Sequence, residues 1–170
     1  MFALIIITMV EAKVTTKVGD KGKTFYKDGE FISKGDDIIE FFGCIDELQV
    51  ALGGIDKYID ERSKQNIVEV QKKLFDIYSE KITFDDVDKI ELWQKELMDK
   101  YTITYDWNLT TPKTLNIDEA RVRARKTERA YHRCKIQNKP EATMKYLNRL
   151  SDYLWTLGRS VHSVPKGKSK

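Results

Sequence analysis

Apolar residues recur at alternating intervals of three and four positions in five separate stretches of this chain of 170 residues. The stretches cover residues 38–52, 67–77, 90–97, 117–134 and 147–157. This spacing gathers the apolar side chains of each stretch on one face of an α-helix. Because most connections between the stretches are short, consecutive helices should run antiparallel. The sequence therefore predicts an all-α fold, a five-helix antiparallel bundle.

Residues that cap or end helices flank these stretches. We expect helices to begin at Asp36-Asp37, Asp60, Asp85-Asp86, Asn116 and Pro140-Glu141, and the first helix to end at Gly53-Gly54. Residues 1–35 combine glycines with many charged residues, which predicts an N-terminal strand and loop segment of the same domain. The bundle is expected over residues 36–163, followed by a frayed basic tail over residues 164–170.

The composition and charge of the chain limit the kinds of partner that it is expected to bind. Thirty basic against 27 acidic residues leave a net charge of +3, too mild a balance to demand nucleic acid or a membrane surface. No apolar run reaches the roughly 18 to 20 residues that span a bilayer. The apolar residues 1–10 lack the basic start and cleavage pattern of a signal peptide, so we favour an additional strand, or translation from Met9, over secretion. Two cysteines are too few for a disulfide framework, and we expect a cytoplasmic protein.

A glycine-rich stretch, residues 15–24, has features of an anion-binding loop. Its end, Gly22-Lys23-Thr24, imitates a P-loop, but a P-loop needs glycine where this chain has Lys17. Gly19 and Gly22 would still let the backbone curl so that N–H groups converge on an anion, with three lysines adding positive charge. The alternative is an ordinary solvated turn, which composition alone favours.

The predicted fourth helix concentrates positive charge beside its apolar stripe. Residues 121–135 contain seven basic residues and a single acid, Glu128. Arg121, Arg125, Glu128 and Arg129 fall within one sector of about 100° that borders the apolar stripe. Guanidinium groups placed there can line a cleft or a subunit interface and hold phosphate oxygens. From the residues alone, surface salt bridges explain the pattern equally well.

The remaining polar candidates are isolated. Asn148 neighbours Leu147 at the core boundary of the fifth predicted helix, so its amide should have a specific hydrogen-bond partner, unless it is partly exposed. Cys44 and Cys134 lie on or beside apolar stripes, and we interpret them as core thiols rather than nucleophiles. The two histidines show no metal-ligand spacing.

Ordered motifs along the chain resemble those of the PduO-type ATP:corrinoid adenosyltransferases. The family patterns T-R-T-G-D-x-G-x-T, G-E-x-x-x-K and G-x-x-D-E-L-N match residues 16–24, 29–34 and 43–49. I-Q-x-x-L-F matches residues 70–75, A-R-x-x-x-R-R-A-E-R matches residues 120–129, and Y-L-N-R-L-S-D matches residues 146–152. The resemblance spans about residues 15–160.

The resemblance implies a homotrimer of five-helix bundles with active sites between subunits. Its substrates would be ATP and a reduced corrinoid such as cobalamin, with Mg²⁺ bridging phosphate oxygens. The reaction moves the 5′-deoxyadenosyl group of ATP onto cobalt and releases triphosphate. Because Co(I) is itself the nucleophile, the protein must align C5′ with cobalt and neutralise the leaving group.

The resemblance also implies roles for individual residues. The implied nucleotide ligands are Thr16, Lys17, Gly19, Asp20, Lys21, Gly22, Lys23, Thr24, Lys34, Arg125, Lys126, Glu128, Arg129 and Asn148. Asp46 and Arg121 match a pair that bridges subunits beside the corrinoid, and Arg121 and Arg125 are the expected catalytic residues. Glu128 would meet a metal ion through Mg-ATP. Tyr105, 16 positions before Arg121, matches an aromatic residue that displaces the lower ligand of the corrinoid, with Trp107 as the near alternative.

The chain departs from the family pattern at several positions. Residues 108–110 are Asn-Leu-Thr in place of Pro-Gly-Gly, Lys126 replaces an arginine, and Asp118 replaces a histidine. Lys126 keeps the charge but loses the bidentate fork of arginine. The altered loop at residues 102–115 motivates an alternative function, a non-catalytic relative that binds ATP or a corrinoid. A nucleic-acid-binding bundle is a third alternative, which the net charge of +3 and Glu128 disfavour.

Overall fold

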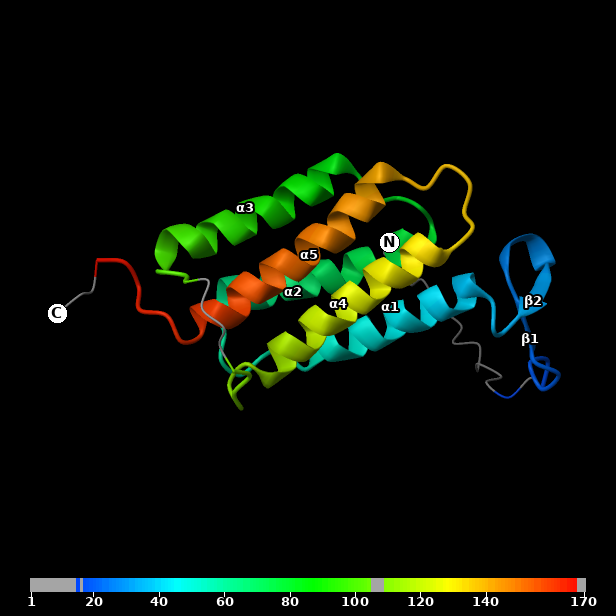
Figure 1. The fold of residues 1–170 in the computed structure, drawn as a ribbon, viewed down its shortest axis with the longest axis horizontal. Coiled ribbons are helices and arrows are strands. Elements are labelled where there is room, and N and C mark those ends of the chain that lie inside the picture. The colour runs from blue at the N-terminus through cyan, green and yellow to red at the C-terminus, as the bar shows by residue number, and fades with distance from the viewer. Residues whose placement is uncertain (1–14, 16, 105–108, 168–170) are drawn as a thin grey trace, which may run out of the picture. The chain divides into compact units, whose positions relative to one another are not determined.

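The structure is a computed structural model that describes residue 15, residues 17–104 and residues 109–167. The chain divides between Asp36 and Asp37 into two compact units. The N-terminal unit contains an antiparallel hairpin of β1, Lys23–Phe25, and β2, Phe31–Ser33, with Thr24 opposite Ile32 (Figure 1). A 3-10 turn, Lys27–Gly29, joins the two strands, and Gly29 adopts a φ of 79° that favours glycine. Strand fragments and loops were the expectation for this part of the sequence.

The second unit is a helical bundle in which consecutive helices run in opposite directions (Figure 1). Within the described residues it consists of α1 (Asp37–Gly53), α2 (Glu61–Tyr78), α3 (Phe84–Lys100), α4 (Leu115–Arg133) and α5 (Glu141–Ser160). Each helix coincides with one of the periodic apolar stretches. The prediction of a five-helix antiparallel bundle is therefore confirmed.

The core lies where the apolar stripes of the helices meet. α4 packs against both α1 and α5, and α5 also packs against α3. Leu48 of α1 and Leu150 and Leu154 of α5 are completely buried at these contacts. Burial of one such leucine side chain stabilises the fold by about 1.5–3 kcal/mol. The packing of α4 between α1 and α5 fixes the positions of the basic residues that α4 carries.

Two helix starts show how local chemistry sets the boundaries. Asp60 caps α2 by accepting a backbone N–H at 2.9 Å, as predicted. The prediction that α3 begins at Asp85-Asp86 is wrong, because Thr83 is the capping residue. The Thr83 hydroxyl accepts the Asp86 N–H, and the Asp86 carboxylate accepts the Thr83 N–H, which forms a capping box.

The segment after α5 is joined to the end of α3. Pro165 forms an isolated bridge with Tyr101, and the Lys166 N–H donates to the Lys100 carbonyl at 2.9 Å. We expect residues 164–170 to fray, but Pro165 and Lys166 are paired with the end of α3. Residues 168–170 and residues 1–10 lie outside the described residues. None of the helices in the described ranges is long and apolar enough to cross a bilayer.

Candidate functional site

The glycine-rich loop of the N-terminal unit is closed by its own backbone. The Asp20 N–H donates to the Lys17 carbonyl and the Gly22 N–H to the Gly19 carbonyl, both at 3.3 Å. These two N–H groups are therefore engaged within the loop, as in the ordinary turn that composition favoured, and anion binding by this loop remains a prediction. Gly22 has a φ of 75°, which lets the loop turn without steric strain.

Lys34 lies directly against this loop. Its N–H donates to the Gly22 carbonyl at 2.9 Å. A Cβ built on Gly19 would lie only 2.7 Å from Lys34 Nζ, so the ammonium group packs on the Gly19 backbone. Lys17, Lys21 and Lys23, in or next to the same loop, have exposed side chains as well. We call this part of the N-terminal unit, with its four lysines, the cationic surface; its positive charge suits phosphate oxygens.

In the helical unit, α4 and α5 bring two further predicted ligands together. The Asn148 amide on α5 donates to the Glu128 carboxylate on α4 at 3.1 Å. The Asn148 side-chain oxygen accepts a hydrogen bond from Arg149 at 2.7 Å. Asn148 therefore has specific partners, as its place at the core boundary predicted, and its orientation is fixed by both.

A second carboxylate, Asp152, joins this group one turn further along α5. The pKa of Asp152 is raised above its ordinary value, mainly by burial. The positive charge of Arg149 lowers it, the negative charge of Glu128 raises it further, and the positive charge of Arg125 lowers it. The Arg149 guanidinium lies 3.9 Å from the Asp152 carboxylate. We call these residues, Arg125, Glu128, Asn148, Arg149 and Asp152, the α4–α5 cluster. It presents mixed charges with an exposed guanidinium, that of Arg125.

Arg121 lies one turn before Arg125 on α4 and shares its counter-ion with another arginine. Its Nε is 3.5 Å from Asp118 Oδ1, and an Arg159 nitrogen from α5 is 3.4 Å from the same oxygen. The side chains of Asp118 and Arg159 are only 7% and 9% exposed. A single buried carboxylate therefore serves two guanidinium groups, which leaves net positive charge at this point.

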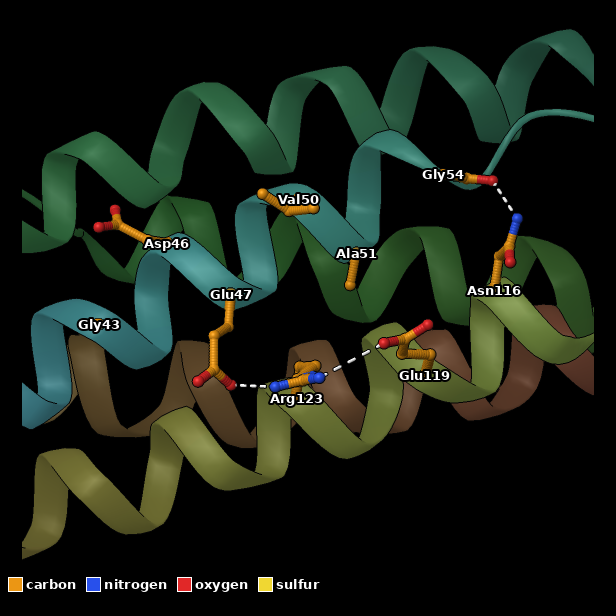
Figure 2. Close-up of a pocket in the computed structure, with 9 residues that line it drawn as sticks. All are labelled: Gly43, Asp46, Glu47, Val50, Ala51, Gly54, Asn116, Glu119 and Arg123. Carbon is orange, nitrogen blue, oxygen red and sulfur yellow. Dashed lines mark hydrogen bonds and ion pairs between the residues drawn. The ribbon is translucent and has the colours of Figure 1, made fainter.

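A groove of about 460 Å³ lies between α1 and α4 (Figure 2). Its lining residues are Gly43, Asp46, Glu47, Val50, Ala51, Gly54, Asn116, Glu119 and Arg123. Beside it the Glu47 carboxylate accepts hydrogen bonds from Lys126, at 2.9 Å, and from Arg123. The Lys126 bond is the largest cause that lowers the pKa of Glu47, and the Arg123 bond adds to it against the opposing effect of burial.

Two sequence-based predictions concern residues at or near this groove. The Lys126 side chain is directed toward α1, where its ammonium group donates to the Glu47 carboxylate. Its role as a nucleotide ligand remains a prediction. The prediction that Asn116 starts α4 is off by one residue, because α4 begins at Leu115. The Asn116 amide instead donates to the Gly54 carbonyl at 2.6 Å, which closes one end of the groove (Figure 2).

Asp46 on α1 is among the residues that line the groove, but its carboxylate is directed toward α2, and its predicted partner lies elsewhere (Figure 2). The Asp46 carboxylate accepts a hydrogen bond from the Tyr78 hydroxyl of α2 at 2.9 Å. Arg121 instead lines a neighbouring groove of about 540 Å³, together with Arg129 and Lys126. Across the parts of the chain that the structure describes, no ion pair joins Asp46 to Arg121.

Comparison with known proteins identifies the family of this chain. The sequence model for cobalamin adenosyltransferases matches residues 14–161, which is most of its length. The chain belongs to the cobalamin adenosyltransferase family. It is similar to the corrinoid adenosyltransferase MMAB of Bos taurus, with 30% identity over 171 residues that cover 86% of this chain and 70% of that protein.

Solved structures of family members share the fold. A variant of the PduO-type ATP:corrinoid adenosyltransferase from Lactobacillus reuteri, complexed with cobalamin and ATP, superposes with a TM-score of 0.77 at 21% identity. That match covers 90% of this chain and 97% of the other. A second variant of this adenosyltransferase, complexed with ATP, gives a TM-score of 0.73 at 22% identity and covers 86% of this chain and 92% of the other.

Some of the predicted site residues lie outside the described residues, and the structure shows contacts that the sequence did not predict. Thr16, Tyr105 and Trp107 lie outside the described residues. Sequence reasoning missed the contacts of Glu47 and Tyr78. Glu47 adjoins Asp46 in the family motif and could have been singled out, whereas no sequence signal connects Tyr78 on α2 to Asp46 on α1.

The residues present fit a magnesium ion that arrives with the nucleotide. Among the described residues there is no group of three or more His, Cys, Asp or Glu that could hold a metal ion. Magnesium in nucleotide sites needs only one or two carboxylates, because phosphates and waters complete its octahedron. Glu128, oriented by Asn148, offers one such carboxylate.

Proposed function

We propose that this member of the cobalamin adenosyltransferase family transfers the 5′-deoxyadenosyl group of ATP to the reduced cobalt of a corrinoid, giving adenosylcobalamin and triphosphate. The observation that carries the proposal is the α4–α5 cluster, in which the predicted nucleotide ligands Glu128 and Asn148 are hydrogen-bonded beside Arg125. The cationic surface of Lys34 and the glycine-rich loop supports it independently.

The proposed reaction is a direct displacement at carbon. Co(I) supplies the electron pair of the new cobalt–carbon bond, the C5′–oxygen bond breaks, and that bond's electrons leave with triphosphate. No protein nucleophile is needed, so the task of the chain is to align the reactants and to stabilise negative charge on the leaving group. This agrees with the burial of both cysteines, Cys44 and Cys134, whose thiols lie within the core.

Each candidate residue has a role in that task. The exposed Arg125 guanidinium would bind the phosphate oxygens on which charge develops. The Asn148 amide would orient the nucleoside, since its other contacts already fix its plane. Mg²⁺ held by Glu128 would neutralise charge on the triphosphate. Lys34 is proposed as a further ligand of phosphate oxygens.

The assembly belongs to the same proposal. We propose a homotrimer in the cytoplasm, with Asp46 of one subunit paired to Arg121 of the next beside the corrinoid. The separation of these residues within one chain and the exposure of Asp46 support the pairing. Two buried thiols are typical of proteins in a reducing compartment. Tyr105 remains the proposed aromatic residue at the lower face of the corrinoid.

An anaerobic absorbance assay tests the function. Chemically reduced cob(I)alamin, ATP and Mg²⁺ are mixed with and without the protein, and adenosylcobalamin is followed by its visible spectrum. We expect formation that depends on the protein and that falls by roughly 10²-fold in Arg125→Ala, the scale of losing one preorganised donor. Arg133→Ala, an exposed arginine of the same helix, is the matched control and should keep full activity.

The assay also separates the non-catalytic alternative. If the protein binds ATP by calorimetry yet forms no adenosylcobalamin from cob(I)alamin, the transferase proposal is wrong. The family site would then serve nucleotide or corrinoid binding alone.

A further inference from the structure

Tyr78 fixes the direction of the Asp46 carboxylate. Its hydroxyl donates to Asp46 Oδ1 at 2.9 Å, and its ring packs on Phe42 with the ring centroids 4.8 Å apart. Asp46 itself is exposed on α1, where it lines the groove between α1 and α4 (Figure 2). An unrestrained exposed aspartate would exchange among several rotamers. The hydrogen bond to a packed phenol favours the rotamer that faces Tyr78.

Asp118 holds Arg121 by an ion pair rather than by a hydrogen bond. Asp118 Oδ1 lies 3.5 Å from Arg121 Nε and 3.4 Å from the Arg159 guanidinium, which itself lies 5.7 Å from the Trp155 ring. Arg121 Nε is buried, whereas the side chain as a whole remains 27% exposed. The base of the guanidinium is therefore held inside the bundle while its outer end reaches the surface.

We infer that Tyr78 and Asp118 are positioning residues for the subunit-bridging pair, Tyr78 aiming Asp46 and Asp118 aiming Arg121 within each chain before subunits meet. This inference rests on the proposed function. Side chains that are already oriented lose less conformational entropy when the interface forms. The corrinoid site beside the pair is then shaped by the assembled protein rather than by the arriving substrate.

Steady-state kinetics of Tyr78→Phe test the first half. The variant removes one hydroxyl from a side chain whose ring packing is unchanged, so folding should be preserved. We expect the KM for corrinoid to rise about three- to tenfold, the cost of one hydrogen bond to a charged group that is partly exposed, while the KM for ATP stays within about twofold. Tyr58→Phe, at an exposed tyrosine, is the control. Equal changes in both KM values, or none, would overturn the assignment.

A double-mutant cycle tests whether Tyr78 acts through Asp46. If it does, Tyr78→Phe has no further effect on the corrinoid KM in an Asp46→Ala background, which lacks the accepting oxygen. The same logic applies to Asp118→Asn in an Arg121→Met background, with thermal denaturation to verify that each variant folds. Additive effects in the Tyr78 cycle contradict the proposal even if the Asp118 variants do not fold.

A readout without substrate separates this inference from the proposed function. Burial and, next, the hydrogen bond to Asp46 raise the pKa of Tyr78 above its ordinary value. In ¹³C NMR of Cζ-labelled tyrosine, the Tyr78 signal should ionise at lower pH in Asp46→Asn than in the wild type. An unchanged titration refutes the positioning contact. A changed titration in a protein without transferase activity refutes the function and leaves the contact established.

Discussion

Gly19→Ala tests the cationic surface directly, because the structure gives the distance by which Lys34 Nζ must move away from the added Cβ. The added Cβ would lie 2.7 Å from Lys34 Nζ and 3.0 Å from its Cε. Ordinary contacts of this kind are about 3.5–4.0 Å, so the ammonium group has to retreat by about 1 Å. Gly19 is not among the described residues with positive φ, so alanine fits its backbone without strain.

The expected loss follows from Coulomb's law. An ammonium group in contact with a phosphate oxygen lies about 2.8 Å away. With an effective dielectric constant of about 20, retreat to about 3.8 Å weakens the attraction from about 5.9 to about 4.4 kcal/mol for unit charges. The difference, about 1.5 kcal/mol, corresponds to a roughly tenfold weaker affinity for ATP.

The assay measures the KM for ATP and the melting temperature of Gly19→Ala, Gly35→Ala and Lys34→Met. Gly35→Ala is the matched control, since its Cβ would meet only Ser33 Oγ at an ordinary 3.6 Å. We expect a tenfold rise in KM for Gly19→Ala, none for Gly35→Ala, and equal melting temperatures for both alanine variants. If Lys34→Met raises the KM but Gly19→Ala leaves it within twofold, the position of Lys34 against Gly19 is not the one that binds ATP.

Two further predictions concern stability. Burial raises the pKa of Asp86, but its hydrogen bonds with Thr83 and Lys73 outweigh burial, so the net pKa is lowered. The ionised Asp86 carboxylate therefore stabilises the fold above the unfolded pKa of about 3.9. This stabilisation is lost as the pH falls through the lower pKa of the folded state. Asp86→Asn should reduce the free energy of unfolding in urea at pH 7, and the deficit should shrink toward pH 3; a constant deficit contradicts this. Thr127→Val removes a buried hydroxyl that donates to the Cys44 carbonyl at 3.0 Å and should cost about 1–2 kcal/mol of unfolding free energy. An equally stable valine variant would show that this bond between α4 and α1 contributes nothing net.

The helices could be predicted because apolar periodicity is a local property of the sequence. The first residues of the helices are harder to predict, because an acidic residue in the first turn can be mistaken for the N-cap residue. Asp86 belongs to the cap of α3 as its third residue, yet the hydroxyl that starts the helix comes from Thr83. The pattern T-x-x-D would have shown this.

The candidate site was predictable only in part, because contacts between elements depend on rotation about each helix axis. Adjacent residues on a helix point about 100° apart, so Arg125 and Lys126 serve different neighbours. Arg125 acts on Asp152 of α5, whereas Lys126 bonds to Glu47 of α1. The family motif contains Arg125 and Lys126 as two adjacent basic residues, so the motif does not indicate that they interact with different helices. The contact between Tyr78 and Asp46 likewise required the packing of α2 beside α1.

The segment after α5 has a consequence for the connection between α3 and α4. Pro165 and Lys166 pair with Tyr101 and Lys100 where that connection leaves α3. His162 Nε2 lies 2.9 Å from the Thr111 hydroxyl, just before the connection enters α4. Both ends of the connection that carries Tyr105 are thus tethered to the same few residues. A chain shortened before His162 would lose both tethers in one cut, so the C-terminus should be left intact when the enzyme is produced for study.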